Sequence, residues 1–381
     1  MHRTALLFNK YLPKATLLSA VSSRTLTGAW SAGLLVVLIG VILLSTALGP
    51  VRIDPVIVAK VLLNALSIPS ELGASTPMGV GSLTVPVPRI ETRPAFAFVV
   101  PETHETIVMR IRLPRVLLAA VVGFALATAG TVMQGFFRNP MADPSIIGVS
   151  SGAAVGAVAS IVLPLGVGLR PAAFVGAVVT AFAVYLVASE GGRTPVATLL
   201  LAGIAIQTFL GAVISYLLIN SGESLEQAVY WLMGHLHNST WSEVGLSLPV
   251  VIPVFVLLLI YAPDLNVLLL GEEDAQTLGI EVERTKRVLL AAASVITAAG
   301  VAVSGVIGFV GLIVPHMMRL LVGPDHRILL PTSALAGSVF LVATDTLARS
   351  GPAEVPVGIV TAALGAPFFL YLLRSREVHA L

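Results

Sequence analysis

The sequence predicts an all-α membrane protein that crosses the bilayer about ten times. Of its 381 residues, 56% are apolar and 11% are charged, and the mean hydropathy is +0.96. A typical soluble domain carries about 25% charged residues, whereas uncharged runs of about 20 residues suit membrane-spanning helices. The expected spans are residues 30–49, 113–134, 145–163, 171–189, 196–219, 244–262, 288–304, 305–321, 329–347 and 356–373.

Three of these spans have boundaries that need an argument. The first apolar run, from Trp30 to Leu48, is long enough to cross the bilayer and has no evident cleavage site. We therefore expect a retained helix there and not a signal peptide. The seventh and eighth spans are separated by glycines without any polar loop, so a nine-span alternative stays open.

The distribution of Lys and Arg predicts the orientation of the chain. With both termini in the cytoplasm, the inner segments carry 13 of these residues and the short outer loops carry two. Residues 1–29 and 374–381 are then cytoplasmic extensions of a transmembrane domain at residues 30–373. Residues 67–106, in the long loop after the first span, are rich in Pro, Gly, Ser and Thr and are expected to form an irregular extracytoplasmic insertion.

A short polar segment between the sixth and seventh spans predicts a surface helix. The segment from Glu272 to Leu278 follows Gly271, has three acids in its first turn and ends at Gly279. It is too short and too charged to cross a bilayer, but it has the start and stop signals of a helix. One interpretation is a docking element for a protein outside the membrane, and the alternative is a solvated interfacial helix.

The residue inventory excludes several energy sources and chemistries. The chain has no cysteine, which removes disulfides and thiolate chemistry, and no lysine follows a glycine, so no phosphate-binding G-x-x-x-x-G-K-[ST] loop exists. Glu190, Glu243 and Asp345 lie near predicted span ends, so the spans contain almost no buried carboxylate of the kind that ion-coupled carriers use. We expect no catalytic residue and no metal site in this chain, and we expect a separate ATPase to dock on residues 272–278.

Three arginines lie at the outer end of the second span, against the usual charge bias. Arg110, Arg112 and Arg115 surround Pro114, which suits the first turn of a helix. A planar guanidinium pairs with carboxylates through two hydrogen bonds, so the cluster is a candidate site for an acidic partner, and Arg349 could join it. The alternative is that these side chains extend along the membrane interface.

The turn after the second span and the helix that follows it contain two further patterns. Residues 138–144 include two prolines and read as a rigid inner turn. Gly148, Gly152 and Gly156 follow at a spacing of four residues, which favours close contact between helices.

The outer segment at residues 230–241 combines aromatic residues with His235 and His237. An imidazole pair could bind a metal or a haem iron. Two histidines without a third ligand make a poor structural metal site, and tryptophans are ordinary at a membrane interface. Both interpretations stay open on the residues alone.

Taken together, these segments resemble the FecCD-type permeases, the membrane subunits of bacterial ABC importers for iron-siderophores, haem and cobalamin. The resemblance covers roughly residues 110–373, leaves out residues 1–29 and 67–106, and follows the order of the family's motifs. The matching segments are Arg112–Arg115, Gly130–Gly135, Asn139–Pro144 with Gly148, Trp231–Gly234, Gly271–Gly279, Gly311–His316, Asp325–Pro331, Glu354–Gly358 and Leu364–Pro367.

The resemblance implies a ten-helix permease domain of the type II ABC importer kind in the bacterial inner membrane. It further implies a second copy of the chain, two ATP-binding cassette subunits that hold ATP and Mg, and one periplasmic substrate-binding protein. The implied site residues are Glu272, Glu273, Asp274, Gln276, Leu278 and Gly279 for coupling to the ATPase, Arg112, Arg115 and Arg349 for docking of the binding protein, and Asn139, Met141, Thr194 and Thr198 for the inner gate.

The cargo is the least determined expectation. Relatives usually continue after the motif at Trp231–Gly234 with small residues, whereas this chain has His235 and His237 there. The resemblance places Trp231, His235 and His237 on the substrate path. Because haem iron accepts an imidazole, the sequence favours haem over a ferric siderophore, with cobalamin third. An ion-coupled secondary carrier is the alternative of another class, and a passive anchor or sensor is a third.

Overall fold

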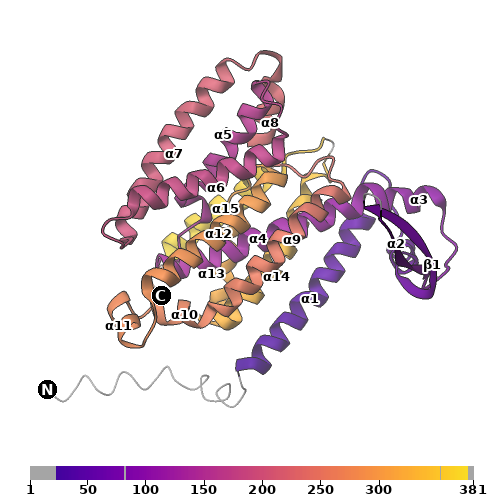
Figure 1. The fold of residues 1–381 in the computed structure, drawn as a ribbon, viewed down its shortest axis with the longest axis horizontal. Helices are drawn as coiled ribbons and strands as arrows, with labels where there is room; N and C mark the ends of the chain where they lie inside the picture. The colour runs from indigo at the N-terminus through magenta and orange to yellow at the C-terminus, as the bar shows by residue number, and fades with distance from the viewer. Residues whose placement is uncertain (1–22, 81–82, 352, 376–381) are drawn as a thin grey trace.

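The computed structural model describes residues 23–80, 83–351 and 353–375, and most of them are helical (Figure 1). The helices are α1 (Ser23–Ala47), α2 (Pro55–Asn64), α3 (Glu102–Thr106), α4 (Leu113–Phe136), α5 (Val149–Val162), α6 (Leu169–Ala188), α7 (Val196–Ile219), α8 (Leu225–Leu232), α9 (Trp241–Ile260), α10 (Ala262–Leu268), α11 (Glu272–Thr277), α12 (Val282–Ser304), α13 (Val310–Val322), α14 (His326–Ala348) and α15 (Val357–Ser375). The strands are β1 (Ser67–Val80) and β2 (Leu83–Pro94), and shorter helical turns are η1 (Ile107–Arg112), η2 (Pro144–Ile147) and η3 (Gly222–Ser224).

Each of the ten expected spans corresponds to a helix of its own. The seventh and eighth are α12 and α13, and the chain between them is not helical, with positive φ angles of 69° at Gly305 and 70° at Phe309. The nine-span alternative is therefore wrong. Seven helical runs are long and apolar enough to cross a membrane, and α5, α13 and α15 are shorter apolar helices.

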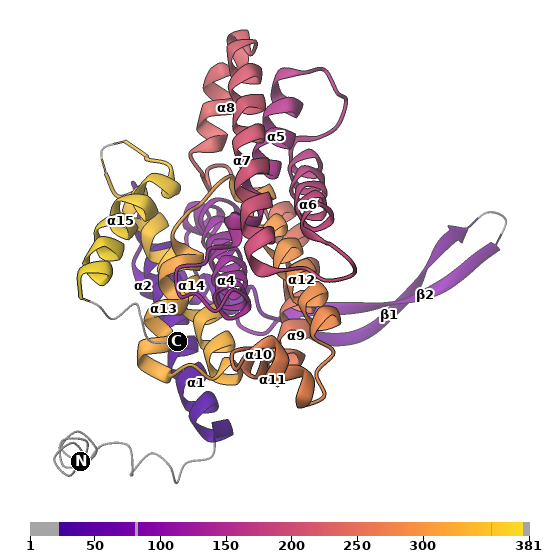
Figure 2. The same cartoon turned by 90° about the vertical axis from the view of Figure 1, so that its left-hand side faces the viewer.

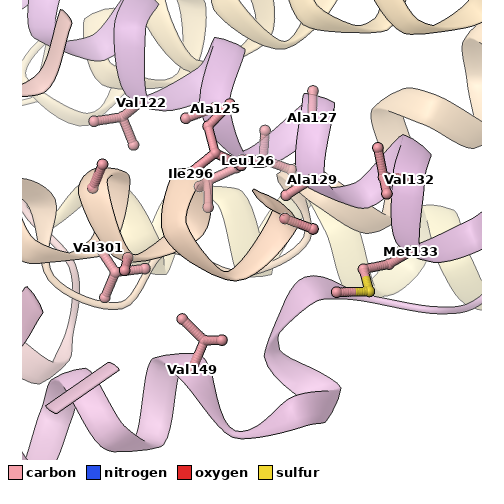
Figure 3. Close-up of a cluster of buried hydrophobic side chains, with 14 of the residues drawn as sticks. Val122, Ala125, Leu126, Ala127, Ala129, Val132, Met133, Val149, Ile296 and Val301 are labelled. Atoms are coloured by element: carbon pink, nitrogen blue, oxygen red, sulfur yellow. The ribbon is translucent and has the colours of Figure 1, made fainter. Parts of the chain in front are cut away.

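Helix α4 forms the centre of the bundle. In its most apolar window 83% of the residues are buried, against 6% for α1 and 17% for α7. Side chains of α4 from Val122 to Met133 share one apolar cluster with Ile296 and Val301 of α12 and Val149 of α5 (Figure 3). Helices α1 and α7 lie on the outside, where their apolar side chains suit lipid or another protein chain.

The expected close contact of the helix after the inner turn is confirmed. A Cβ atom on Gly152 of α5 would lie 2.2 Å from Thr180 Oγ1 and 2.4 Å from the Gly176 carbonyl oxygen of α6. No side chain fits there, and so the glycine spacing lets the backbones of α5 and α6 touch.

The expectation of an irregular segment at residues 67–106 is wrong for residues 67–80 and 83–94, which form two strands, and holds for residues 95–101, which form no helix or strand. Strands β1 and β2 form an antiparallel hairpin that runs from the pair Ser67–Pro94 to the pair Val80–Leu83 and projects away from the helices (Figure 2). A two-stranded ribbon has only edge strands, so it tolerates prolines that would break a central strand. We call the end of the bundle that carries this hairpin the outer end, and the opposite end, with α10 and α11, the inner end (Figure 1).

The second span starts earlier than Pro114, because α3, η1 and α4 form one helical run from Glu102 to Phe136. In η1 the Leu113 N–H donates to the Val108 carbonyl, five residues before it. Pro114 has no N–H to offer Met109 in the same way, and the Met109 carbonyl instead accepts from Trp241 Nε1 at 2.9 Å. The indole of α9 thus satisfies the acceptor that the proline leaves open.

Candidate functional site

Helix α11 at the inner end has the boundaries that the sequence predicted. Gly279 adopts a φ of +88°, its N–H donates to the Gln276 carbonyl, and the Ile280 N–H donates to the Ala275 carbonyl. These two bonds are the Schellman arrangement, which favours glycine because the position after the helix is left-handed.

The outward surface of α11 is acidic with one apolar side chain. Ala275 is fully buried and anchors the helix, while Glu273, Asp274 and Gln276 are exposed. Leu278 is 62% exposed and adds one apolar side chain to this acidic surface. A single small anchor residue and a mixed polar and apolar outer face suit a docking element.

A buried lysine joins α11 to the loop between α6 and α7. Lys286 Nζ, in the first turns of α12, lies 3.1 Å from Glu272 Oε1 of α11 and 3.0 Å from Glu283 Oε1. It also donates to the Thr194 carbonyl at 2.6 Å, and the Thr194 N–H donates to Glu283 Oε2 at 3.1 Å. Sequence reasoning missed this cluster, although the Glu283–Lys286 spacing of three residues on a helix is a recognisable pairing signal.

The expected gate residues occupy two inner loops. Asn139 is exposed, and its Oδ1 accepts from the N–H of the half-buried Met141 at 2.9 Å, which fixes a tight turn. Thr198 is exposed in the first turn of α7, whereas Thr194 is buried with its hydroxyl 3.2 Å from Ser189 Oγ. The gate assignment stays a prediction. Thr194 anchors the loop between α6 and α7 to α12 through its bonds with Glu283 and Lys286.

At the outer end, Arg112 is buried and bonded within the chain. Its guanidinium donates to the carbonyls of Thr46 at 2.9 Å, Ala47 at 3.0 Å and Val51. This side chain therefore ties the end of α1 to η1. Arg112 is 6% exposed, and its docking role stays a prediction.

Arg115 and Arg349 meet carboxylates of the chain itself. Arg115 lies 2.7 Å from Asp345 Oδ1 and 2.6 Å from Glu354 Oε1, and Arg349 Nε lies 3.4 Å from Asp345 Oδ2. Arg349 also donates to the Leu48 carbonyl at 2.9 Å. The exposed member of the cluster is Arg110. Docking of an acidic partner stays a prediction, and Arg110 is the side chain best placed for direct contact.

Two clefts open at the outer end. One, of about 520 Å³, is lined by the arginine cluster together with His237 and Glu354, and the other, of about 490 Å³, is lined by Tyr230, Trp231, His235 and His237. His237 lines both, so it stands between the basic cleft and the aromatic cleft.

The two histidines have different surroundings. The centre of the His235 ring lies 4.8 Å from the centre of the Tyr230 ring, and the Nδ1 atom of His235 is buried without a hydrogen-bond partner. The pKa of His235 is lowered to about 4, mainly by burial and in addition by the positive charges of His237 and Arg115. His237 is 47% exposed, and its Nδ1 lies 3.4 Å from Glu354 Oε2. Within the described ranges no three His, Asp or Glu side chains form a group that could hold a metal ion.

The motif at Trp231–Gly234 has a structural role. Trp231 is buried, the His235 N–H donates to the Ser304 carbonyl at 2.7 Å, and the Gly358 N–H donates to the Gly234 carbonyl at 3.1 Å. The end of α8 is thereby bound to the end of α12 and the start of α15. Trp231, His235 and His237 also line the aromatic cleft, and their place on the substrate path stays a prediction.

Comparison with known proteins decides the family. The model of the FecCD transport family matches residues 35–375. This chain belongs to the FecCD family. It is 58% identical to the cobalamin import system permease protein BtuC of Halobacterium salinarum over 93% of this chain and 98% of that protein. It is 47% identical to the hemin transport system permease protein HmuU of Yersinia pestis over 71% of this chain and 84% of that protein.

A solved structure of an ABC transporter agrees with the fold. An inward-facing metal-chelate type ABC transporter superposes with a TM-score of 0.72 at 30% identity, covering 91% of this chain and 98% of that chain. The chain is therefore a multi-pass permease of the ABC importer type that serves metal chelates and related cargos. The expected family and fold class are confirmed.

Proposed function

We propose that two copies of this chain form the path of an ATP-driven importer, with a separate ATP-binding cassette subunit docked on α11 of each copy. The observation that carries this proposal is the outward face of α11, where Glu273 and Leu278 are exposed and unmatched within the described chain. ATP and Mg are bound by the partner subunits. The family membership supports the same arrangement.

A variant of α11 tests this proposal. Glu273→Ala combined with Leu278→Ala leaves the buried anchor Ala275 in place, and so we expect folded protein that imports at least ten-fold less per ATP hydrolysed. The matched control is Glu223→Ala combined with Leu225→Ala, an acid and an exposed leucine at the outer end. Normal import by the α11 variant with its ATPase would refute the assignment.

For the cargo, we propose cobalamin in preference to haem. The support is the 58% identity to a cobalamin permease along nearly its whole length. The histidine argument for haem is weakened because His235 packs on Tyr230 and His237 pairs with Glu354. Haem remains the second candidate, since the partnerless Nδ1 of His235 lies beside the aromatic cleft.

Uptake into proteoliposomes decides between the cargos. The permease, its ATPase and its binding protein are reconstituted together, and cyanocobalamin, hemin and ferric citrate are compared under the same ATP supply. We expect saturable uptake of cyanocobalamin that requires ATP and survives a protonophore. Hemin uptake that is lost in the variant His235→Ala with His237→Ala would instead establish haem. Uptake driven by an ion gradient without ATP would establish the secondary carrier.

The outer basic cleft is proposed as the docking site of the binding protein, in a membrane orientation with both termini cytoplasmic. Arg110 makes the direct contact, while Arg112, Arg115 and Arg349 supply a positive field from buried positions. Arg110→Glu should weaken binding-protein stimulation of the ATPase, because a like charge then faces the partner's carboxylates. Raising salt from 0.1 to 1 M shortens the screening length from about 10 to 3 Å and should mimic part of the loss. Arg93→Glu in β2 is the control, and equal effects of both variants would contradict the assignment.

A further inference from the structure

We propose that Lys286 is the positioning residue that transmits movement of α11 to the loop between α6 and α7, and through that loop to α7. This inference rests on the proposed docking of an ATPase on α11. It adds a defined mechanical link between the docking helix and one inner gate loop.

The ammonium group of Lys286 has three acceptors on three elements. Its side chain is 5% exposed, and its Nζ reaches oxygens of Glu272, Glu283 and Thr194 at 3.1, 3.0 and 2.6 Å. An ammonium has three N–H donors, so the contacts match its full capacity. A buried charge is costly unless it is paired in this way, and therefore the side chain has little freedom to leave its position.

The loop that Lys286 holds is itself closed. Glu190 and Arg193 exchange two backbone hydrogen bonds of 2.9 and 3.0 Å around Gly191 and Gly192, whose positive φ angles of 58° and 78° suit a two-residue hairpin turn. The N–H of Thr194 is bonded to Glu283 and its carbonyl to Lys286. The peptide groups on both sides of Thr194 are thus held by α12.

Helix α7 is the element that such a movement would reach. It begins directly after Pro195, and only 17% of its most apolar window is buried, against 83% for α4. An element with few buried contacts needs less free energy to shift than a central one. A displacement of α11 that passes through Glu272, Lys286 and Thr194 therefore acts on α7, a span that the rest of the bundle holds with few buried contacts.

The two carboxylates that contact Lys286 differ in exposure and in the helix that carries them. Glu272 is 41% exposed, whereas Glu283 is 26% exposed and lies on the same helix as the lysine. Removing Glu272 separates α11 from the link and leaves the bonds between α12 and Thr194 intact. Removing the Lys286 charge cuts the contact with Glu272 and the bond to the Thr194 carbonyl, and of these bonds leaves only the one from the Thr194 N–H to Glu283 between α12 and the loop. The pair of variants distinguishes transmission from a purely structural role of the lysine.

The experiment uses Lys286→Met, Glu272→Ala and the control Arg287→Gln, an exposed basic neighbour on α12. Each is reconstituted with the ATPase and binding protein, and import per ATP hydrolysed is measured with the affinity for the ATPase. We expect Lys286→Met to bind the ATPase normally and to import at least five-fold less per ATP hydrolysed. Glu272→Ala should import at least five-fold less per ATP hydrolysed by the ATPase that it still binds, Lys286→Arg should recover part of the loss, and Arg287→Gln should match the wild type. Normal import per ATP in Glu272→Ala would overturn the proposal.

A second readout needs no ATPase. Because the chain has no cysteine, Arg193→Cys gives a unique site for a nitroxide label on the loop. We expect the label to become more mobile in Lys286→Met and, to a smaller extent, in Glu272→Ala. Unchanged mobility in both would overturn the link. Failure of the wild type to import with any ATPase would refute the proposed function, while the mobility comparison would still decide whether the link exists.

Discussion

Asp345 is the carboxylate on which the outer arginines converge. Its side chain is 1% exposed and faces Arg115 and Arg349, so two guanidinium groups compensate one buried negative charge. Breaking a buried ion pair from one side leaves the remaining charge unpaired, which costs more than the pair contributes when intact.

We therefore expect Asp345→Asn to destabilise the protein by about 3 kcal/mol, the typical cost of breaking a buried pair. The measurement is the thermal unfolding temperature in detergent. Glu281→Gln removes a carboxylate from the exposed pair with Arg284, where both side chains are more than 60% exposed, and should leave that temperature unchanged. Equal unfolding temperatures for Asp345→Asn and the wild type would show that Asp345 is not needed to compensate the arginines.

His235 should make stability depend on pH. Burial lowers its pKa from 6.5 to about 4, and so between these values the unfolded chain binds the proton before the folded chain does. The contribution of neutral His235 is fully present above about pH 6.5 and stability falls as the pH is lowered towards 4. His235→Gln should flatten this dependence, measured as the difference in unfolding temperature between pH 7.5 and pH 5. An unchanged difference would mean that the histidine titrates normally.

The sequence identified the arginine cluster but not its partners. Arg112 bonds to carbonyls 61 to 66 positions earlier in the chain, and Arg115 pairs with Asp345, 230 positions later. Charge bias shows that a cation at a span end is unusual, but a single sequence contains no information on which distant oxygen lies beside it. The same limit hid the contacts of Lys286, whose acceptor at Thr194 lies 92 positions earlier.

At the scale of elements, contact between α5 and α6 depends on the absence of side chains. Gly152→Ala places a Cβ atom 2.4 Å from the Gly176 carbonyl oxygen, which cannot move without its helix. We expect a loss of about 1–3 kcal/mol, typical of overpacking, measured as a lower unfolding temperature. Gly211→Ala in α7 is the matched control, because nothing lies within 4 Å of its added Cβ. A stable Gly152→Ala protein would show that the two helices separate readily.

The long apolar elements were predictable and the short ones were not. Residues 196–219 carry no charge and are long enough to cross a bilayer, so the sequence predicts a span, and α7 covers the same residues. Helices α2, α8 and α10 have 7 to 10 residues, and their stability comes from packing against neighbours that the sequence does not reveal. The β1–β2 hairpin was not predicted because prolines and glycines usually interrupt strands.

At the scale of the whole molecule, the two ends of the bundle carry different chemistry. The inner end has the acidic face of α11 and the closed loop before α7, and the outer end has the basic cleft and the hairpin. Figure 1 shows the hairpin and α11 at opposite ends of the bundle. A permease that takes cargo from one protein and energy from another needs two unlike surfaces on opposite sides of the bilayer. The separation of these surfaces matches that requirement. The proposed roles of both surfaces therefore depend on the orientation of the chain in the membrane.

The orientation can be measured directly because the chain has no cysteine of its own. The bias of 13 inner to two outer Lys and Arg residues predicts that Gln276 and Arg193 face the cytoplasm and that Asn238 and Glu223 face the opposite side. Single cysteines at these four exposed positions should react with a membrane-impermeant maleimide in complementary sets. In intact cells only Asn238→Cys and Glu223→Cys should be labelled, and in inverted vesicles only Gln276→Cys and Arg193→Cys. The reverse pattern would place α11 outside the cell, where no ATP supply could reach a subunit docked on it.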